Sequence, residues 1–373
     1  MTLKHDLPTT IARYYRGART VHIERLAHFT PGDFLYYKPM YDFDDELARR
    51  TPGVRRVTFA HVFSCVLRRR YEVLELAEPF TPSALPQNLA LALASRLSAI
   101  GGKTPTRFVT YAIENADLSA KIARKFRVPG SLITPIVSNL VYFCYSRFDR
   151  IAFGTAAAEH NYKALLGTRR FNRSRPAHTL IWGLPASQLT ASRTRPQRLL
   201  FLGALDDRKG ILQLMDAWDA VSRLVPQATL TILGKGKYAS RVEQWAEQRD
   251  EVSLIVNPSR ETIGEELLAG KALFLLSQPS ALWKEQIGLP ILEGLETGLE
   301  IVASTETGVA GWLADNGHQV LDPDCDTKTV ALAIERALSS SRTPAEVAGD
   351  LPNVDGRFAA DCWLFESHTL ARN

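Results

Sequence analysis

The sequence has little cysteine, and its four cysteines are scattered. Cys65, Cys144, Cys325 and Cys362 form no CxxC pair, which argues against a zinc site or a disulfide framework and fits a reducing compartment. The N-terminus also lacks the apolar core of a signal peptide. We therefore expect a cytoplasmic protein.

Long hydrophobic runs are absent as well. The longest one, residues 132–145, contains Pro135, Ser138 and Asn139 and is too short to span a bilayer. At 373 residues the chain is too long for one ordinary core, so two domains are expected. The apolar content of 45% and charged content of 23% are those of a soluble globular protein.

Acidic residues are scarce in the first half of the chain. Residues 1–195 hold 29 Lys and Arg against 14 Asp and Glu, a net charge of +15, whereas the remainder has a net charge of −10. Such asymmetry suggests a nucleic-acid or membrane-surface partner for the first half. A solvated basic face is the alternative.

The second half alternates short apolar segments with segments of helical spacing. This alternation predicts a parallel sheet with helices on both faces, and such sheets bind ligands in the loops at the carboxyl ends of their strands. The predicted strands are residues 198–202, 229–233, 252–256, 272–276 and 299–303, and the predicted helices are 211–225, 238–248, 261–269, 291–297 and 327–339.

The first half indicates a second α/β domain less clearly. Segments 70–76, 107–113 and 150–154 resemble strands, and 86–100 and 156–166 resemble helices. The polar, Pro-punctuated stretch 190–196 is the best linker candidate, and 355–368 is expected to form a terminal helix. We predict domains at 1–192 and 193–350, followed by a C-terminal helical segment at 351–373.

Two carboxylates, Glu285 and Glu293, flank a Gly288-Leu289-Pro290 turn before a predicted helix. Proline suits the first turn of a helix, and the backbone N–H groups there attract anions. Acids beside an anion site make sense if a sugar hydroxyl and a ribose diol are held next to a diphosphate. The alternative is that Glu293 only stabilises the helix start and Glu285 is a loop acid.

The loop after the first strand of the second half carries two adjacent cations, Arg208 and Lys209, between Gly203 and Gly210. These cations can meet a diphosphate, and glycine lets the backbone turn tightly. An ordinary exposed loop is the alternative. Gly234-Lys-Gly236 is a weaker signal, which permits close approach of a ligand but is common at strand ends.

In order and spacing, these motifs resemble the donor half of retaining glycosyltransferases of family 4, which have the GT-B fold. The resemblance covers residues 198–339. It is carried by Glu285 through Glu293 with Gly288-Leu289-Pro290 inside, by the following 298–308 segment, and by Gly203 through Gly210. It implies two Rossmann-like domains facing a cleft, with the C-terminal helix crossing back to the first domain.

The resemblance also implies roles for individual residues. Lys209 would hold the donor diphosphate, Glu285 the transferred sugar, and Glu293 the ribose diol, while Asn257 lies where the family contacts the base. Fixed cations and helix N–H groups would stabilise the leaving group, so no metal ion is expected. Further donor contacts are expected at Gly203, Arg208, Gly234, Gly288, Leu289 and Pro290.

The sequence departs from the family pattern in two places, one on the donor side and one on the acceptor side. Ala204 stands where an arginine is usual, and we hypothesise that Arg208 substitutes for it. The family's acceptor-side histidine has no obvious counterpart. Glu114, which follows the predicted strand 107–113, is the preferred catalytic candidate, ahead of His61, and His160 is expected on a plain helix.

Enzymes that resemble this chain often extend lipid-linked acceptors at the inner membrane face. A basic first domain would be attracted to anionic lipids, and segment 54–71 is a candidate amphipathic helix for peripheral binding. The alternative is an internal helix or strand with solvated charges. Nucleic-acid binding is not expected, because no aromatic and basic platform is present.

Taken together, the sequence predicts a metal-independent retaining hexosyltransferase. The donor would be a UDP- or GDP-linked sugar, with no further cofactor, and the acceptor a glycan or lipid-linked molecule in cell-surface polysaccharide or glycolipid synthesis. Two competitors remain open: a non-catalytic homologue that binds nucleotide sugar or glycan, and a sugar-nucleotide epimerase of the same architecture.

Overall fold

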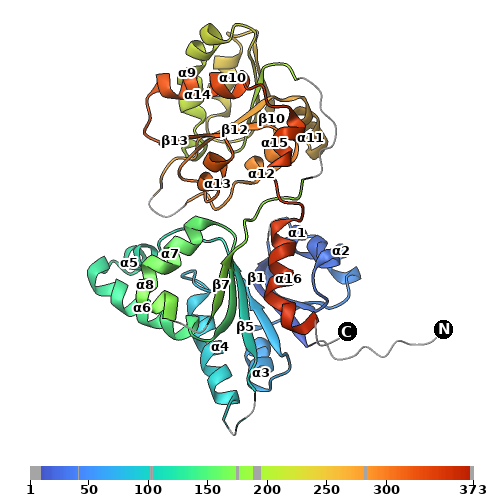
Figure 1. Cartoon of the computed structure of the whole chain (residues 1–373), viewed down its shortest axis with the longest axis vertical. Coiled ribbons are helices and arrows are strands. Elements are labelled where there is room, and N and C mark those ends of the chain that lie inside the picture. Colours follow the sequence, from blue (N-terminus) through green and yellow to red (C-terminus); the bar gives the residue numbers. More distant parts are fainter. Residues whose placement is uncertain are drawn as a thin grey trace, which may run out of the picture. The chain divides into compact units, whose positions relative to one another are not determined.

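The computed structural model describes residues 10–40, 42–100, 102, 104–173, 176–187, 195–280 and 284–369. The chain folds into two compact units (Figure 1). Unit 1 comprises Met1–Trp182 and Arg357–Asn373, and unit 2 comprises Gly183–Gly356. The predicted boundary at 192–193 and the predicted linker as far as residue 194 lie outside the described residues.

Unit 1 contains a seven-stranded parallel sheet in the order β3-β2-β1-β4-β5-β6-β7. Its strands are β1 (Ile11–Ala18), β2 (Asp33–Pro39), β3 (Val54–Arg56), β4 (Val73–Leu76), β5 (Arg107–Ala112), β6 (Phe148–Phe153) and β7 (Ala177–Leu180). Its helices are α1 (Thr20–Glu24), the 3₁₀ helix η1 (Arg25–His28), α2 (Asp45–Arg50), α3 (Phe59–Leu67), α4 (Leu85–Ser98), α5 (Leu118–Phe126), α6 (Gly130–Tyr145), α7 (Ala156–Leu166), α8 (Thr168–Arg173) and α16 (Gly356–Thr369).

Helices cover both faces of this sheet. On one face, α3, α4, α6 and α7 bury the main core of the unit. On the other face, α16 packs against the strands through Ala360, Leu364 and Phe365, and Figure 1 shows it in red beside the blue and green elements of unit 1. The C-terminal helix therefore crosses back to the first domain, as predicted.

A buried ion network fastens α16 to the central strands. Arg13 of β1 bonds Asp361 of α16, with Nε 3.1 Å from Oδ1, and lies 3.4 Å from Glu75 of β4. Arg357, at the start of α16, donates to the same Glu75. Buried charges are tolerated only when they are paired in this way, so the network specifies where the returning helix docks.

Unit 2 contains a six-stranded parallel sheet in the order β10-β9-β8-β11-β12-β13. Its strands are β8 (Arg198–Leu202), β9 (Thr229–Gly234), β10 (Val252–Val256), β11 (Ala272–Leu275), β12 (Glu300–Ser304) and β13 (Gln319–Leu321). Its helices are η2 (Asp207–Lys209), α9 (Ile211–Leu224), α10 (Ala239–Ala246), α11 (Arg260–Ala269), α12 (Leu289–Glu296), α13 (Ala310–Asp315), α14 (Thr327–Leu338) and α15 (Pro344–Gly349). All five predicted strands are present within about a residue.

The strand order of unit 2 reverses between β8 and β11. The chain first adds β9 and β10 on one side of β8 and then continues with β11, β12 and β13 on the other. The loops that follow β8 and β11 therefore diverge over a switch point at the carboxyl edge of the sheet. In open α/β sheets, ligands bind at this point.

For segment 54–71 the structure supports the alternative of an internal strand and helix. Segment 54–71 is not a single amphipathic helix, because it forms strand β3 and then the separate helix α3. Thr58 caps α3 by accepting a bond from the backbone N–H of His61, 3.3 Å away. The apolar residues Val62 and Val66 face the core of the unit, and Phe59 and Phe63 pack partly against it, while Leu67 at the end of the helix is 41% exposed.

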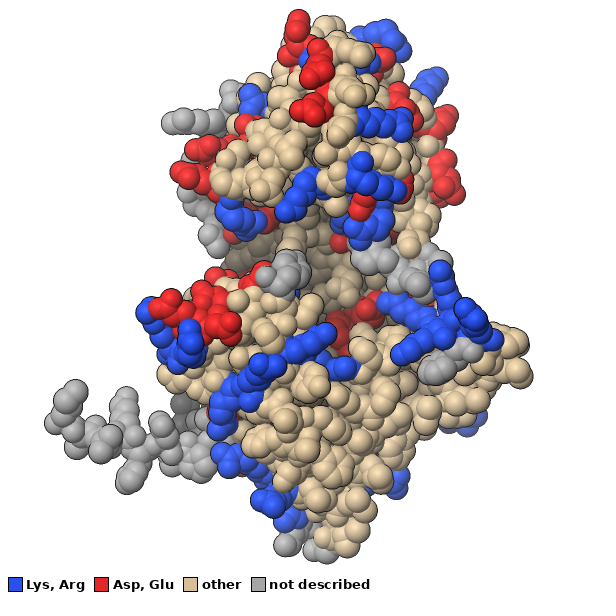
Figure 2. All heavy atoms as spheres, turned by 180° about the vertical axis from the view of Figure 1, so that it is seen from behind, with Lys and Arg blue, Asp and Glu red and all other residues tan. Residues whose placement is uncertain are grey.

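The surface of unit 1 reflects the basic first half of the sequence. On the face that Figure 2 presents, Lys and Arg side chains border a broad area without charged side chains. Within the described ranges, no helix is both long enough and apolar enough to cross a membrane.

Candidate functional site

Three loops at the carboxyl edge of the unit 2 sheet bring together two charged side chains. Lys209, in the loop after β8, donates through Nζ to Glu285 Oε2, in the loop after β11. The side chains are only 13% and 11% exposed. Ser277, fully buried, also donates to Glu285 Oε2 at 3.3 Å. The two predicted catalytic residues of this domain therefore meet at the switch point.

The loop around Lys209 is held from both sides. Asp206 begins η2 by accepting a bond from the backbone N–H of Arg208 at 2.9 Å. Gly210 follows with a φ of +78°, and a Cβ there would lie 2.5 Å from the carbonyl oxygen of Leu276. Glycine is thus required for the loop to approach the end of β11. This close approach aims Lys209 at the neighbouring loop.

Glu285 is held by the loop that follows β12. Its backbone pairs with Thr307 in an isolated parallel bridge, and its carbonyl accepts a bond from Gly308 at 3.1 Å. The Thr307 hydroxyl donates to the carbonyl of Ile287 at 2.7 Å. These contacts fix the backbone at Glu285 and Ile287, so the carboxylate of Glu285 is positioned before any ligand arrives.

Helix α12 begins beside this pair. Gly288 precedes the helix with a φ of +87°, and Pro290 lies in the first turn, as the sequence predicts. Leu289, the first helical residue, is exposed. A helix start carries partial positive charge and spare N–H donors. An anion next to Lys209 would therefore also meet the beginning of α12.

Glu293 has a different partner from Glu285. Its carboxylate accepts a bond of 2.8 Å from Arg260 of α11, and its side chain is 23% exposed. The two carboxylates of the predicted motif are thus paired with different cations, Glu285 with Lys209 and Glu293 with Arg260. This separation is compatible with one acid at the sugar and the other at the nucleoside.

The glycines at 203, 234 and 236 allow the loops after β8 and β9 to pack closely against each other. A Cβ at Gly234 would lie 1.9 Å from the carbonyl oxygen of Gly203, and one at Gly236 would lie 2.4 Å from that of Leu205. A side chain at either position would separate the loops after β8 and β9. Their part in the site is therefore to let these loops approach one another.

Two other predicted donor residues lie at the rim of the loops. Asn257, with a φ of +52°, follows β10 and accepts a bond from Lys235 Nζ at 3.0 Å. Arg208 donates two hydrogen bonds to one carboxylate oxygen of Asp206, with nitrogen–oxygen distances of 3.0 and 2.6 Å. Ala204 lies in the same loop, and the guanidinium of Arg208 is paired with Asp206, the residue that precedes η2.

In unit 1, Glu114 follows β5 and accepts a bond from Lys121 of α5 at 3.3 Å. The structure adds Glu78, which follows β4 with a φ of +44° and which sequence reasoning missed. Its carboxylate accepts bonds from the backbone N–H groups of Ile113, at 2.7 Å, and of Glu114, at 3.3 Å. Burial raises the pKa of Glu78 to about 8 despite these bonds. Glu78 thus holds the loop that carries Glu114.

The two histidines considered from the sequence lie on helices. His61 is exposed in the first turn of α3 and contacts Cys65, with Nε2 3.5 Å from Sγ. His160 is exposed on α7, as expected for a plain helix. Among the residues that the structure describes, no group of three His, Cys, Asp or Glu is placed to hold a metal ion.

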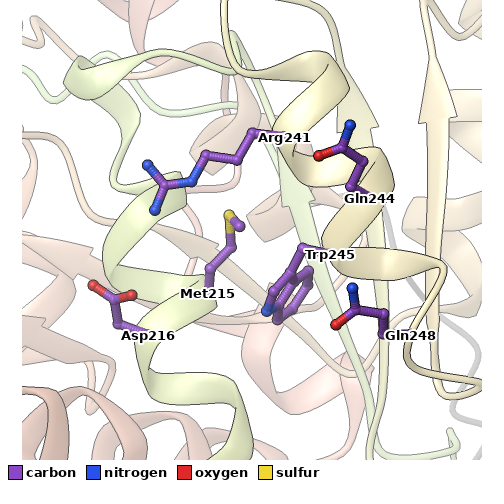
Figure 3. Close-up of a pocket in the computed structure, with 6 residues that line it drawn as sticks. All are labelled: Met215, Asp216, Arg241, Gln244, Trp245 and Gln248. Carbon is purple, nitrogen blue, oxygen red and sulfur yellow. The ribbon is translucent and has the colours of Figure 1, made fainter.

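A separate pocket of about 270 Å³ lies between α9 and α10. Figure 3 shows Trp245 and Met215 pointing toward one another across it. The guanidinium of Arg249 lies 4.6 Å from the centre of the Trp245 ring. None of the side chains placed at the switch point lines this pocket. Its lining residues are Met215, Asp216, Arg241, Gln244, Trp245 and Gln248.

Comparison with known families finds a match for the second unit. Residues 187–348, nearly all of unit 2, match the family model of glycosyl transferases group 1. This match supports the glycosyltransferase that the motifs predict. A search of curated protein sequences finds no match.

Comparison with solved structures extends over both units. HepE from Anabaena, in complex with UDP and glucose, is similar with a TM-score of 0.61 at 12% identity, over 98% of this chain and 100% of that one. The apo form of the lipopolysaccharide outer core galactosyltransferase WaaB gives 0.66 at 12% identity, over 97% and 99%. An E. coli structure described as trehalose-6-phosphate bound with UDP-2-fluoro glucose gives 0.58 at 11%, over 96% and 98%. At these identities the likeness shows the fold, which is of the GT-B type, as predicted.

Proposed function

We propose that this chain is a retaining glycosyltransferase of the family 4 type, which takes a hexose from a nucleotide-diphosphate sugar bound by unit 2. The observation that carries the proposal is the Lys209–Glu285 pair at the switch point, beside the start of α12. A cation and a helix start suit a diphosphate, and a buried carboxylate suits sugar hydroxyls.

Lys209 has the chemistry that the leaving group needs. As the bond between the anomeric carbon and the diphosphate breaks, negative charge grows on the departing phosphate oxygen. A fixed ammonium group and the N–H groups of α12 stabilise this charge more than they stabilise the bound donor, which lowers the barrier. We therefore expect transfer to proceed without an added divalent cation.

Glu285 orients the sugar in this account. Its carboxylate is held by Ser277 and by the backbone bridge to Thr307. An ionised carboxylate accepts bonds only, so it would receive the hydroxyls of the hexose and fix the ring against the diphosphate. The acceptor oxygen then forms its bond to the anomeric carbon on the face that the diphosphate leaves, and the departing phosphate takes the acceptor's proton.

The nucleoside would extend toward Glu293 and Asn257. A ribose diol can donate two hydrogen bonds to Glu293, whose carboxylate is partly exposed and bonded to Arg260. HepE and the E. coli structure are described with UDP or UDP-sugars. This makes UDP-hexoses the first donors to test and GDP-hexoses the second.

The acceptor is proposed to be a glycan or a lipid-linked molecule, with Glu114 as its contact in unit 1. Glu114 follows a central strand, is bonded to Lys121, and has its backbone held by Glu78. WaaB is described as acting on the lipopolysaccharide outer core. On this basis we place the reaction in the synthesis of surface polysaccharide or glycolipid.

The experiment is a donor screen with product analysis. The purified protein is incubated with UDP- and GDP-hexoses and candidate acceptors, and the release of nucleoside diphosphate and the new anomeric linkage are followed by NMR. The proposal predicts a glycoside that keeps the donor's anomeric configuration. An isomerised sugar nucleotide would instead identify an epimerase, and binding without any turnover would identify a non-catalytic homologue.

A further inference from the structure

Large apolar side chains gather on the outer faces of α4 and α6 in unit 1. Ile100, just after α4, is 73% exposed, and on α6 Leu132 is 63% and Ile136 is 56% exposed. A single exposed leucine is ordinary, but a set of large apolar side chains exposed together calls for an explanation. The exposed set comprises Leu93, Leu97 and Ile100 together with Leu132, Ile136 and Leu140, and we call it the α4–α6 apolar surface.

The spacing of these residues makes one stripe on each helix. Leu132, Ile136 and Leu140 recur every fourth residue along α6, whereas Val137 and Val141, about a quarter turn further round the helix, are buried in the core. The two helices pack against each other. At one contact the guanidinium of Arg96 lies 5.6 Å from the centre of the Phe143 ring. The stripes therefore belong to neighbouring helices of one surface.

The helices that form and adjoin this surface carry charge of one sign. The sequence has no Asp or Glu between Glu78 and Glu114, and none between Asp117 and Asp149. These two intervals contain all of α4, α5 and α6. The exposed cations Arg96, Arg124, Lys125 and Arg127 lie on or directly after α4 and α5.

We propose that the α4–α6 apolar surface docks unit 1 onto an anionic lipid bilayer. Aliphatic side chains beside cations, with no acids among them, have the composition of an interfacial membrane-binding surface. A second copy of this chain would bring the same cations against one another, which disfavours self-association. In this role the surface takes the place of segment 54–71, which is not one helix and whose Val62 and Val66 are buried in the core.

The position of α5 gives this surface a connection with the proposed function. Lys121 of α5 is bonded to Glu114 at 3.3 Å, so the helix beside α6 also reaches the proposed acceptor residue. This connection rests on the proposed function. A lipid-linked acceptor would meet Glu114 at the membrane that the α4–α6 apolar surface binds. The docking itself does not depend on catalysis.

The experiment measures binding of the full chain to vesicles by flotation, at low and high salt. Vesicles of phosphatidylcholine alone are compared with vesicles that also contain phosphatidylglycerol. We expect binding to the anionic vesicles that weakens at high salt. Leu132→Ser with Ile136→Ser should lower this affinity by about tenfold or more, because apolar area is no longer buried in the lipid. Arg124→Gln with Lys125→Gln should lower binding to anionic vesicles only.

Leu224→Ser with Leu268→Ser is the matched control, because these leucines are 49% and 57% exposed on unit 2. It should bind as the unchanged protein does. The proposal is overturned if the unchanged protein does not bind anionic vesicles, or if the α6 variant binds them equally well. A dimer in solution that the α6 variant abolishes would also overturn it, in favour of a second copy. Transfer to a water-soluble acceptor, measured on the same variants, reports separately on the proposed function.

Discussion

Lys209 and Glu285, 76 positions apart in the sequence, form an ion pair over the switch point of the unit 2 sheet. Both side chains are largely buried, so each depends on the other for its charge to be tolerated. The loops after β8, β11 and β12 hold the pair in place before a substrate binds. Such preorganisation allows a site to stabilise developing charge without rearranging at the moment of reaction.

Replacing Glu285 tests the sugar-binding role. Glu285→Gln keeps the shape of the side chain and its backbone bridge but removes the charge beside Lys209. We expect kcat to fall by about 10²-fold or more, a loss typical of groups that act in the transition state. Steady-state kinetics with the best donor measure this. Glu293→Gln is the matched comparison and should raise the donor KM with a smaller change in kcat, so equal effects on both parameters would contradict the separate roles.

The contact between the loops after β8 and β9 predicts a difference between two glycine substitutions. Gly234→Ala should destabilise the protein by about 1–3 kcal/mol, because the new methyl group would overlap the carbonyl of Gly203. Gly264→Ala, in α11 with open space around it, should stabilise by about 0.5–1 kcal/mol. Denaturant unfolding measures both, and a Gly234→Ala protein as stable as the original would show that the loops are not tightly packed.

The buried network under α16 predicts a large effect at Asp361. Asp361→Asn removes one of the two carboxylates that pair with the buried Arg13 and should cost about 3–5 kcal/mol of stability. Glu366→Gln removes an ion pair to Arg150 from a side chain that is 59% exposed, and it should cost less than about 1 kcal/mol. Thermal and denaturant unfolding distinguish the two, and similar losses would refute the assignment of the network as the anchor of α16.

The carboxyl of Glu78 predicts a dependence of stability on pH. Burial raises its pKa from 4.5 to about 8 in the folded protein. The folded state therefore holds a proton that the unfolded state releases, so this group's contribution to stability falls as the pH rises from about 4.5 to 8. Melting temperatures across this range should show a slope that Glu78→Gln flattens and Glu366→Gln leaves unchanged. An unchanged slope in Glu78→Gln would mean that this carboxyl ionises normally.

The fold of unit 2 could be predicted closely because its local signals agree with its tertiary structure. Its strands are short apolar runs, and its glycines, such as Gly210 and Gly288, stand where the backbone has a positive φ. Unit 1 resisted the same reasoning. Strand β1 carries Arg13, whose buried charge is paired with Glu75 of β4 and with Asp361 of α16, which returns some 350 residues later.

The candidate site was predictable only in part, for a related reason. Charge type and spacing around the Gly-Leu-Pro turn made it possible to recognise Lys209, Glu285 and Glu293 in the sequence. Ser277 and Thr307, which hold Glu285, are ordinary residues in sequence and gain their roles from loops that meet over the sheet edge. Glu78 likewise gave no local signal, because its burial arises from the packing around β4 and β5.

The most direct test of the account is the binding of nucleoside diphosphates and their sugars to the intact chain, measured by calorimetry. The account predicts that UDP or GDP, and the matching sugar nucleotide, bind the unchanged protein. Lys209→Ala should weaken this binding by about tenfold or more, because a charge-assisted bond to phosphate is lost. Lys237→Ala, which removes an exposed pair with Asp207 in the same region, should bind normally. If no nucleoside diphosphate binds, or if Lys209→Ala binds as tightly as the unchanged protein, the assignment of the switch point as a donor site is wrong.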